Sequence, residues 1–273
     1  MTTNPVVDML LNRKSIRKYK GEQPSDEVVR TVVRAGQQAP FAYQLCSVLL
    51  SRRGAKKPFG APLLFTICVD AHKLELIMAQ RGWKMATNDL SLLVMGIQDA
   101  ALVAENMVIA AESLGLGSCF LGAAPYQADK IAREYRLPPR VFPIVQLVMG
   151  YPAEAPPPRP RYPLEYALFE DEYPQLDLPA VQEAMKAMDE YYLREGYYRQ
   201  LDAKIVLEDG RQDGFTYDDY TWSEHISRKA GQWEALPERI LTQFAGRGFR
   251  IPGYGGDRGV SGEKSGMRKT GAL

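Results

Sequence analysis

The chain has 273 residues, a length that fits one large domain or one domain with an extension. Hydrophobic residues make up 45% of it and charged residues 25%, the proportions of an ordinary soluble globular protein. The formal net charge is +1, so no overall electric field draws the protein to nucleic acid or to a membrane surface, and we expect neither as a partner.

The three cysteines, Cys46, Cys68 and Cys119, are too few and too scattered for a disulfide framework or a zinc site. Each lies among apolar neighbours, which favours reduced, buried thiols and a reducing compartment. The N-terminus has no basic start followed by an apolar core, and no apolar run approaches the roughly 20 residues that span a bilayer. The sequence therefore predicts a cytoplasmic protein.

The first forty residues predict two helices. Pro5 suits the first position of a helix that has an apolar face and should end near Asn12. A second helix is predicted from Ser25 to Gly36, because Ser25 can cap it and two acidic residues fill its first turn. Pro40 prevents this helix from extending further.

Between these helices the sequence concentrates positive charge. Arg13, Lys14, Ser15 and Arg17 place three cations and a hydroxyl within five residues. An arginine offers a rigid fork of donors, a lysine a point charge and a serine a short donor, a combination that suits a phosphate. The alternative is a solvated helix end, because cations are often found in the last turn of a helix.

Short apolar runs predict the strands of the core. Residues 47–51, 63–69 and 144–149 are expected to be buried strands. Residues 98–114 predict a helix that is apolar almost all round, with one narrow polar stripe repeating every seven residues. We expect it to be the central helix of the domain, to form part of a subunit interface, and to end at Gly115.

A weaker helical pattern runs from residue 71 to about residue 85. Trp83 and several apolar side chains on this segment look exposed. The segment is either a flap over a pocket or an ordinary surface helix.

Two glycine-containing runs do not qualify as nucleotide-binding motifs. Residues 115–122 lack the Gly-x-Gly-x-x-Gly spacing and follow a helix rather than a strand, which argues against a Rossmann site. Residues 262–265 lack the preceding glycine of a Walker loop.

A proline-rich connector, residues 156–161, is expected to be extended and stiff. It carries Arg159 and Arg161, which either meet an anion or belong to a solvated linker.

The composition changes after about residue 175. Helices are predicted over residues 180–200, from Thr221 onward, and from Pro237 to Gly246. This part has many aromatic residues but no obvious core of its own. We therefore expect a domain over residues 1–175 and an extension over 176–273 that packs on that domain or on a partner subunit.

Five stretches follow one another along about residues 8 to 170: Asn12 to Arg17, Ala39 to Gln44, Asp99 to Gly117, Val148 to Pro152 and Arg161 to Glu165. In this order they resemble motifs of one family, the nitroreductase-like FMN-dependent oxidoreductases. The resemblance implies an α+β fold, a mixed sheet flanked by helices, here followed by a mainly helical C-terminal extension. It also implies a homodimer formed through the central helices, with FMN held at the dimer interface.

The resemblance assigns roles residue by residue. The basic run, Arg13, Lys14, Ser15 and Arg17, matches the motif that holds the FMN phosphate and the polar edge of the flavin ring. Arg161, helped by Arg159, matches the basic residue that closes on the phosphate. The remaining cofactor-binding positions implied are Pro40, Phe41, Ala42, Gln44, Leu121 and Gly122.

One stretch departs from the family pattern, Pro-Ser-x-x-Asn-x-Gln-Pro. Here Phe41 replaces the Ser, Gln44 the Asn and Cys46 the Gln. Hydrogen bonds from this stretch to the flavin ring or its ribityl chain are therefore not expected to follow the usual pattern. Phe41 and Tyr43 would instead shape a more apolar substrate pocket.

The function implied is hydride transfer from NAD(P)H through flavin N5 to an electron-poor small molecule, a nitroaromatic, quinone or enone. The alternative of another class is a non-catalytic flavin-binding or redox-sensing protein with a degenerate site. A third possibility is another enzyme of the same superfamily, such as a reductive dehalogenase or an enone reductase. No catalytic acid or base is assigned, because His72 and His225 are the only histidines and neither lies in a matching motif.

Overall fold

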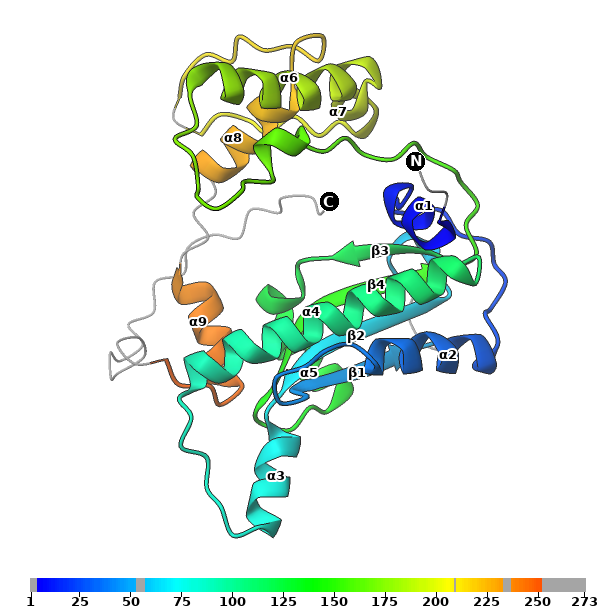
Figure 1. The fold of residues 1–273 in the computed structure, drawn as a ribbon, viewed down its shortest axis with the longest axis vertical. Helices are drawn as coiled ribbons and strands as arrows, with labels where there is room; N and C mark the ends of the chain where they lie inside the picture. Colours follow the sequence, from blue (N-terminus) through cyan, green and yellow to red (C-terminus); the bar gives the residue numbers. More distant parts are fainter. Residues whose placement is uncertain (1–3, 53–56, 209, 233–236, 252–273) are drawn as a thin grey trace. The chain divides into compact units, whose positions relative to one another are not determined.

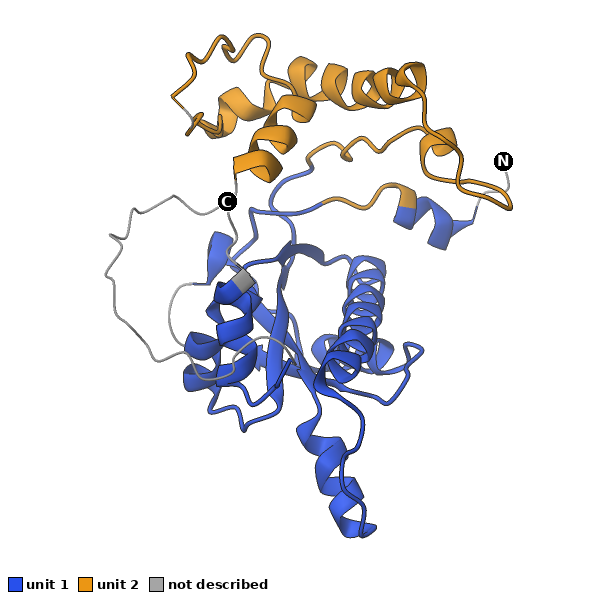
Figure 2. Ribbon diagram, turned by 90° about the vertical axis from the view of Figure 1, so that its left-hand side faces the viewer, with its two compact units in different colours: residues 1–10, 15–155, 237–273 blue, residues 11–14, 156–236 orange. Residues whose placement is uncertain are grey.

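The computed structural model describes residues 4–52, 57–208, 210–232 and 237–251. The glycine-rich basic end, with the run at 262–265, lies outside the described residues. The chain forms two compact units (Figure 2). The first unit comprises residues 1–10, 15–155 and 237–273, and the second comprises residues 11–14 and 156–236. These limits differ from the division expected after residue 175.

The first unit is built on a four-stranded sheet in the order β1-β2-β4-β3. The strands are β1 (Cys46–Ser51), β2 (Leu63–Asp70), β3 (Gly117–Leu121) and β4 (Val141–Gly150). Every neighbouring pair is antiparallel, and parallel pairing in the described chain is confined to a single bridge between Ser15 and Ser118. The expected α+β class is confirmed. The sheet was expected to be mixed, whereas all of its neighbouring strands are antiparallel.

The helix α4 (Asp89–Ser113) lies across one face of this sheet, and α2 (Asp26–Gln37) packs beside it (Figure 1). The side chains of α4 join those of β2 and β4 in the main apolar core. Gly36 permits the close approach of the two helices, because a Cβ there would lie 2.6 Å from Cγ of Met107. The predicted central helix is confirmed, and it begins earlier than expected.

Helix α4 is long and apolar enough to span a membrane by length and composition, although no apolar run of that length was expected. Among the described residues, α4 is the one helix with both this length and this apolar composition. Its buried side chains pack against the sheet and α2, as those of a core helix do.

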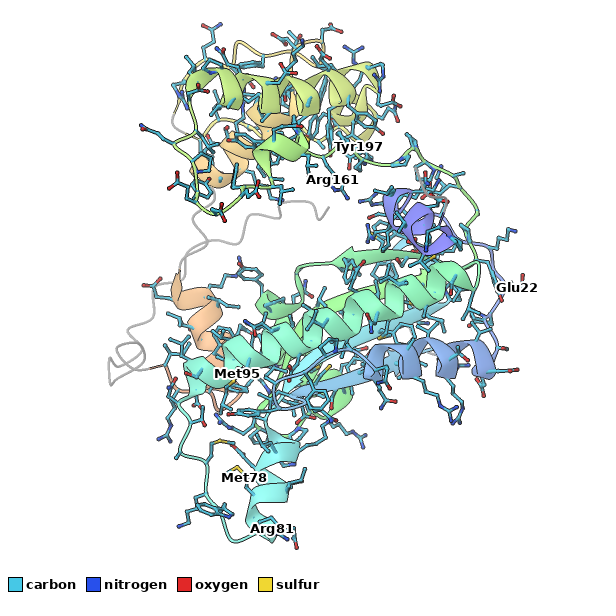
Figure 3. All side chains as sticks on the ribbon, in the orientation of Figure 1. Glu22, Met78, Arg81, Met95, Arg161 and Tyr197 are labelled. Carbon is cyan, nitrogen blue, oxygen red and sulfur yellow. The ribbon has the colours of Figure 1, made fainter. Side chains whose placement is uncertain are left out.

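Shorter helices lie around the sheet: α1 (Pro5–Leu11), α3 (His72–Gln80) and α5 (Ala128–Tyr135). None of the side chains of α3 is buried, and Trp83 just beyond it is 71% exposed. Figure 3 shows Met78 and Arg81 at the far end of α3, away from the sheet. The expected helix is confirmed, and its role as a flap stays a prediction.

The helix α9 (Pro237–Gly246) belongs to the first unit although it lies near the C-terminus. The ring centroid of Phe244 is 4.4 Å from that of Phe142, and Phe249 packs edge-on against the same ring. The last described part of the predicted extension thus belongs to a second apolar cluster of the first unit.

The second unit contains α6 (Leu178–Arg194), α7 (Tyr197–Leu201) and α8 (Trp222–Gln232). Tyr198 and Tyr220 are buried, and His225 stacks on Tyr198 with ring centroids 4.3 Å apart. Arg228 is 4% exposed and forms ion pairs with Asp213 and Glu224. The aromatic residues noted in the sequence therefore form a small core of their own.

Candidate functional site

The segment that carries Ser15 and Arg17 runs beside the start of β3. Ile16 is buried, and its backbone N–H donates to the carbonyl of Ser118 at 2.8 Å. Gly117 makes this approach possible, because a Cβ there would lie 2.5 Å from Cγ1 of Ile16. Since successive side chains of an extended segment point to opposite sides, burial of Ile16 turns Ser15 and Arg17 away from the core.

Glu154 fixes the next turn of this segment. Its Oε1 accepts the backbone N–H of Arg17 and, at 3.0 Å, that of Lys18. The hydroxyl of Tyr19 donates to the carbonyl of Ile16 at 2.6 Å, and burial raises the pKa of Tyr19 above its ordinary value. The Arg17 guanidinium is exposed and lies 6.0 Å from the ring centroid of Phe59. The backbone is therefore held while the cation stays accessible.

The other expected basic residues lie in the second unit. Arg13 and Lys14 group with that unit, next in the chain to Ser15. The Arg159 guanidinium lies 3.8 Å from the ring centroid of Tyr197, and Arg161 donates to the carbonyls of Arg159 and Pro160. Figure 3 labels Arg161 and Tyr197 on this unit. Convergence of these cations on one phosphate stays a prediction.

The segment from Pro40 to Gln44 is exposed, and a buried carboxylate holds it in place. Asp99, in α4, is 2% exposed and accepts the backbone N–H groups of Ala42, Tyr43 and Leu45. Sequence reasoning quoted Asp99 only as part of a motif and assigned it no role. The signal was a carboxylate on a helix expected to be buried on most sides, since a buried charge must find hydrogen-bond partners.

The two candidate segments lie at opposite ends of the sheet. The loop 40–45 leads into β1, whose first residue pairs with Val69, and β2 and β4 continue this end through the Asp70–Val141 pair. Ser15 lies at the other end, where Gly117 pairs with Gly150. In Figure 1, α3 leaves the sheet at the first end and α4 delivers the chain to β3 at the second. The ten residues of β4 make the separation about 30 Å.

Leu121 is the last residue of β3 and Gly122 follows it. Strand β3 is the edge strand of the sheet beside which Ser15 lies. Leu121 is half-buried and pairs with Gln146. A Cβ added at Gly122 would meet nothing within 4 Å, so the space beside this backbone is open.

Other chemistry is not assembled in the described part of the chain. It contains no group of three or more His, Cys, Asp or Glu placed to hold a metal ion. Cys68 and Cys119 are buried and Cys46 is half-buried, all as free thiols, and burial raises the pKa of Cys46 to about 12. A cavity of about 780 Å³ lies in the second unit beside Phe215 and Arg228, and none of the expected cofactor residues lines it.

Comparisons with known proteins place these features in a family. Residues 49–151 match the sequence profile of the Nitroreductase family. A Cr(VI) reductase of Pseudomonas sp. strain G-1 is 30% identical over 215 residues, 72% of this chain and 87% of that protein. An FMN reductase (NADPH) of Bacillus subtilis is 28% identical over 186 residues, 62% of this chain and 75% of that protein.

The fold agrees with these relatives. The solved structure of NfrA2 from B. megaterium superimposes with a TM-score of 0.78 at 23% identity, covering 91% of this chain and 99% of that one. Sequence and fold together show that the chain belongs to the nitroreductase family.

Proposed function

We propose that this protein is an FMN-dependent oxidoreductase that passes reducing equivalents from NAD(P)H to an electron-poor small molecule. The observation that carries the proposal is the segment 15–18, whose backbone is fixed by Ser118 and Glu154 while the Arg17 cation stays accessible. Membership in the nitroreductase family supports the choice of cofactors, because enzymes of this family use FMN and NAD(P)H. Nitroaromatics, quinones and enones are the proposed acceptors, with chromate added by the name of the Pseudomonas relative.

The donor set suits the phosphate of FMN. A phosphate monoester carries nearly two negative charges and accepts several hydrogen bonds. Ser15 and Arg17, with Arg13 and Lys14 next to them in the chain, offer a hydroxyl and three cations. Open space at Gly122 suits the approach of a flat ring to the backbone.

FMN would supply the redox chemistry, accepting hydride at N5 from the nicotinamide and passing it to the acceptor. The protein would supply binding and electrostatics. Arg17 is the residue we assign to the polar edge of the ring, where its charge stabilises the negative charge that reduction brings. Phe41 and Tyr43, which are 57% and 49% exposed, offer aromatic surface to a flat acceptor. No side chain is assigned as acid or base.

The separation of the two candidate segments supports a homodimer. About 30 Å within one sheet exceeds the length of one FMN molecule, so residues 15–17 and 40–44 of the same chain cannot both touch it. Two copies packed through α4 would bring the basic segment of one to the loop of the other. Exposed apolar side chains on α4 offer surface for such packing: Leu90, Val94, Ile97 and Leu102.

The test is direct. The purified protein should be yellow, should bind FMN stoichiometrically, and should lose its visible absorbance when NADH or NADPH is added without oxygen. Turnover across nitroaromatic, quinone, enone, organohalide and chromate acceptors would identify the substrate class. A colourless protein that ignores added FMN would refute the proposal. Bound flavin that neither NADH nor NADPH reduces would favour the alternative of a flavin-binding or redox-sensing protein. The altered stretch Phe41 to Cys46 motivates this alternative.

A further inference from the structure

Asp99 makes three hydrogen bonds to one short loop that follows α2. Its Oδ1 accepts the N–H of Ala42 at 2.7 Å, and its Oδ2 accepts those of Tyr43 at 3.3 Å and Leu45 at 2.8 Å. Among the described residues this carboxylate forms no ion pair, and its hydrogen-bond donors are these three backbone N–H groups. These three N–H groups stabilise the buried carboxylate, so the side chain holds its hydrogen bonds only while the loop keeps this shape.

The loop is bent around this carboxylate. Leu45 is fully buried, whereas Pro40 to Gln44 are exposed. Gln44 has φ of 55°, in the left-handed region, and the N–H of Cys46 donates to the carbonyl of Gln44 at 2.8 Å. A residue other than glycine keeps such a conformation only where its surroundings hold it. Asp99 accepts hydrogen bonds from the residues on both sides of Gln44, namely Tyr43 and Leu45.

We infer that Asp99 is a positioning residue for the flavin site, and this inference rests on the proposed function. Asp99 fixes the positions of Phe41, Tyr43 and Gln44 relative to the flavin and the acceptor. Asp99 itself contacts neither the flavin nor the acceptor. Three N–H groups of the loop are committed to Asp99, so the loop meets the flavin mainly with side chains and carbonyl oxygens. This accounts for how a loop lacking the usual Ser and Asn still presents one defined surface.

The test compares Asp99→Asn with Asp70→Asn. Asp70 serves as the control: it is 5% exposed, lies in the same unit, and accepts hydrogen bonds from Ser47 and from the N–H of Lys73, but it also forms an ion pair with Lys73. In Asp99→Asn the amide NH₂ faces backbone donors, so at least one of them loses its acceptor. FMN should bind about tenfold more weakly, because a buried unsatisfied donor is costly. The visible circular dichroism of the bound flavin should change, and the KM for the acceptor should rise at saturating FMN.

Asp70→Asn should lose about as much thermal stability as Asp99→Asn. Its FMN affinity should stay within about twofold of the wild-type value, and its flavin spectrum should be unchanged. Unchanged FMN affinity and spectrum in Asp99→Asn, or equal changes in Asp70→Asn, would overturn the inference. If Asp99→Asn does not fold, amide hydrogen exchange of the wild type decides. The N–H groups of Ala42, Tyr43 and Leu45 should be protected, and rapid exchange at all three would overturn it. A wild type that binds no FMN refutes the proposed function instead.

Discussion

The hydroxyl of Tyr220 lies 3.2 Å from Nδ1 of His225, inside the aromatic cluster of the second unit. The same hydroxyl accepts the backbone N–H of Ile205 at 3.0 Å, so its own hydrogen is free to donate to the imidazole. Donation from this hydroxyl to Nδ1 fits a neutral His225. Burial, and then the charge of Lys229, lower the pKa of His225 below its ordinary value.

The first prediction concerns acid stability. The unfolded chain binds a proton at His225 near pH 6.5, whereas the folded chain does so only at lower pH, so stability should fall as pH drops below about 6.5. The loss should level off once the folded protein is protonated as well. Thermal denaturation followed at several pH values measures this. His225→Gln should remove this component, and His72→Gln should keep it. An identical pH dependence in His225→Gln would contradict the assignment.

The second prediction concerns the accessible cation of the basic segment. Arg17→Ala should weaken FMN binding by roughly ten- to hundredfold, since a charge-assisted hydrogen bond contributes about 1.5–3 kcal/mol. Lys18→Ala is the control, because Lys18 is the exposed neighbour and its backbone N–H is bound by the same Glu154. Fluorescence titration with FMN measures both. Equal losses in the two variants would mean that only general positive charge matters.

The third prediction concerns the contact between the basic segment and β3. Gly117→Ala should destabilise the protein by about 1–3 kcal/mol, because the new methyl group would overlap Ile16. Gly122→Ala, which meets no atom within 4 Å, should stay within about 0.5 kcal/mol of the wild type. Denaturant unfolding without FMN gives both values. Adding Ile16→Ala to Gly117→Ala should relieve the overlap, and strict additivity of the two changes would argue against it.

The fourth prediction concerns a site shared between subunits. Arg17→Ala disables the basic segment, and Ala42→Pro removes an N–H bound by Asp99 and disables the loop. In a heterodimer of the two variants, one of the two composite sites has both parts intact. Co-expression with two affinity tags should therefore give heterodimers with turnover that neither homodimer has. Heterodimers as inactive as both parents would show that each site is built from one chain.

Several elements could be read directly from the sequence because their signals are local. Ser25 caps α2 through the N–H of Val28, as its position before an acidic turn predicts. The confinement of polar residues over 98–114 to one narrow stripe predicts a buried helix, and α4 is that helix. Helix α9 begins at Pro237 and ends at Gly246, as predicted.

Other features depend on strands and helices that meet across long stretches of chain. The sequence alone determined that Arg17 is part of a basic run and that α4 is a core helix, because composition and periodicity act over a few turns. Only the tertiary structure decided that Asp99 holds the loop at Ala42, 57 residues away, and that this loop and Ser15 lie at opposite ends of the sheet. Strand register is set by side-chain packing between distant segments, which local patterns do not encode. The basic run at Arg13 to Arg17 therefore gains its backbone anchors from Ser118 and Glu154, residues that no motif near it names.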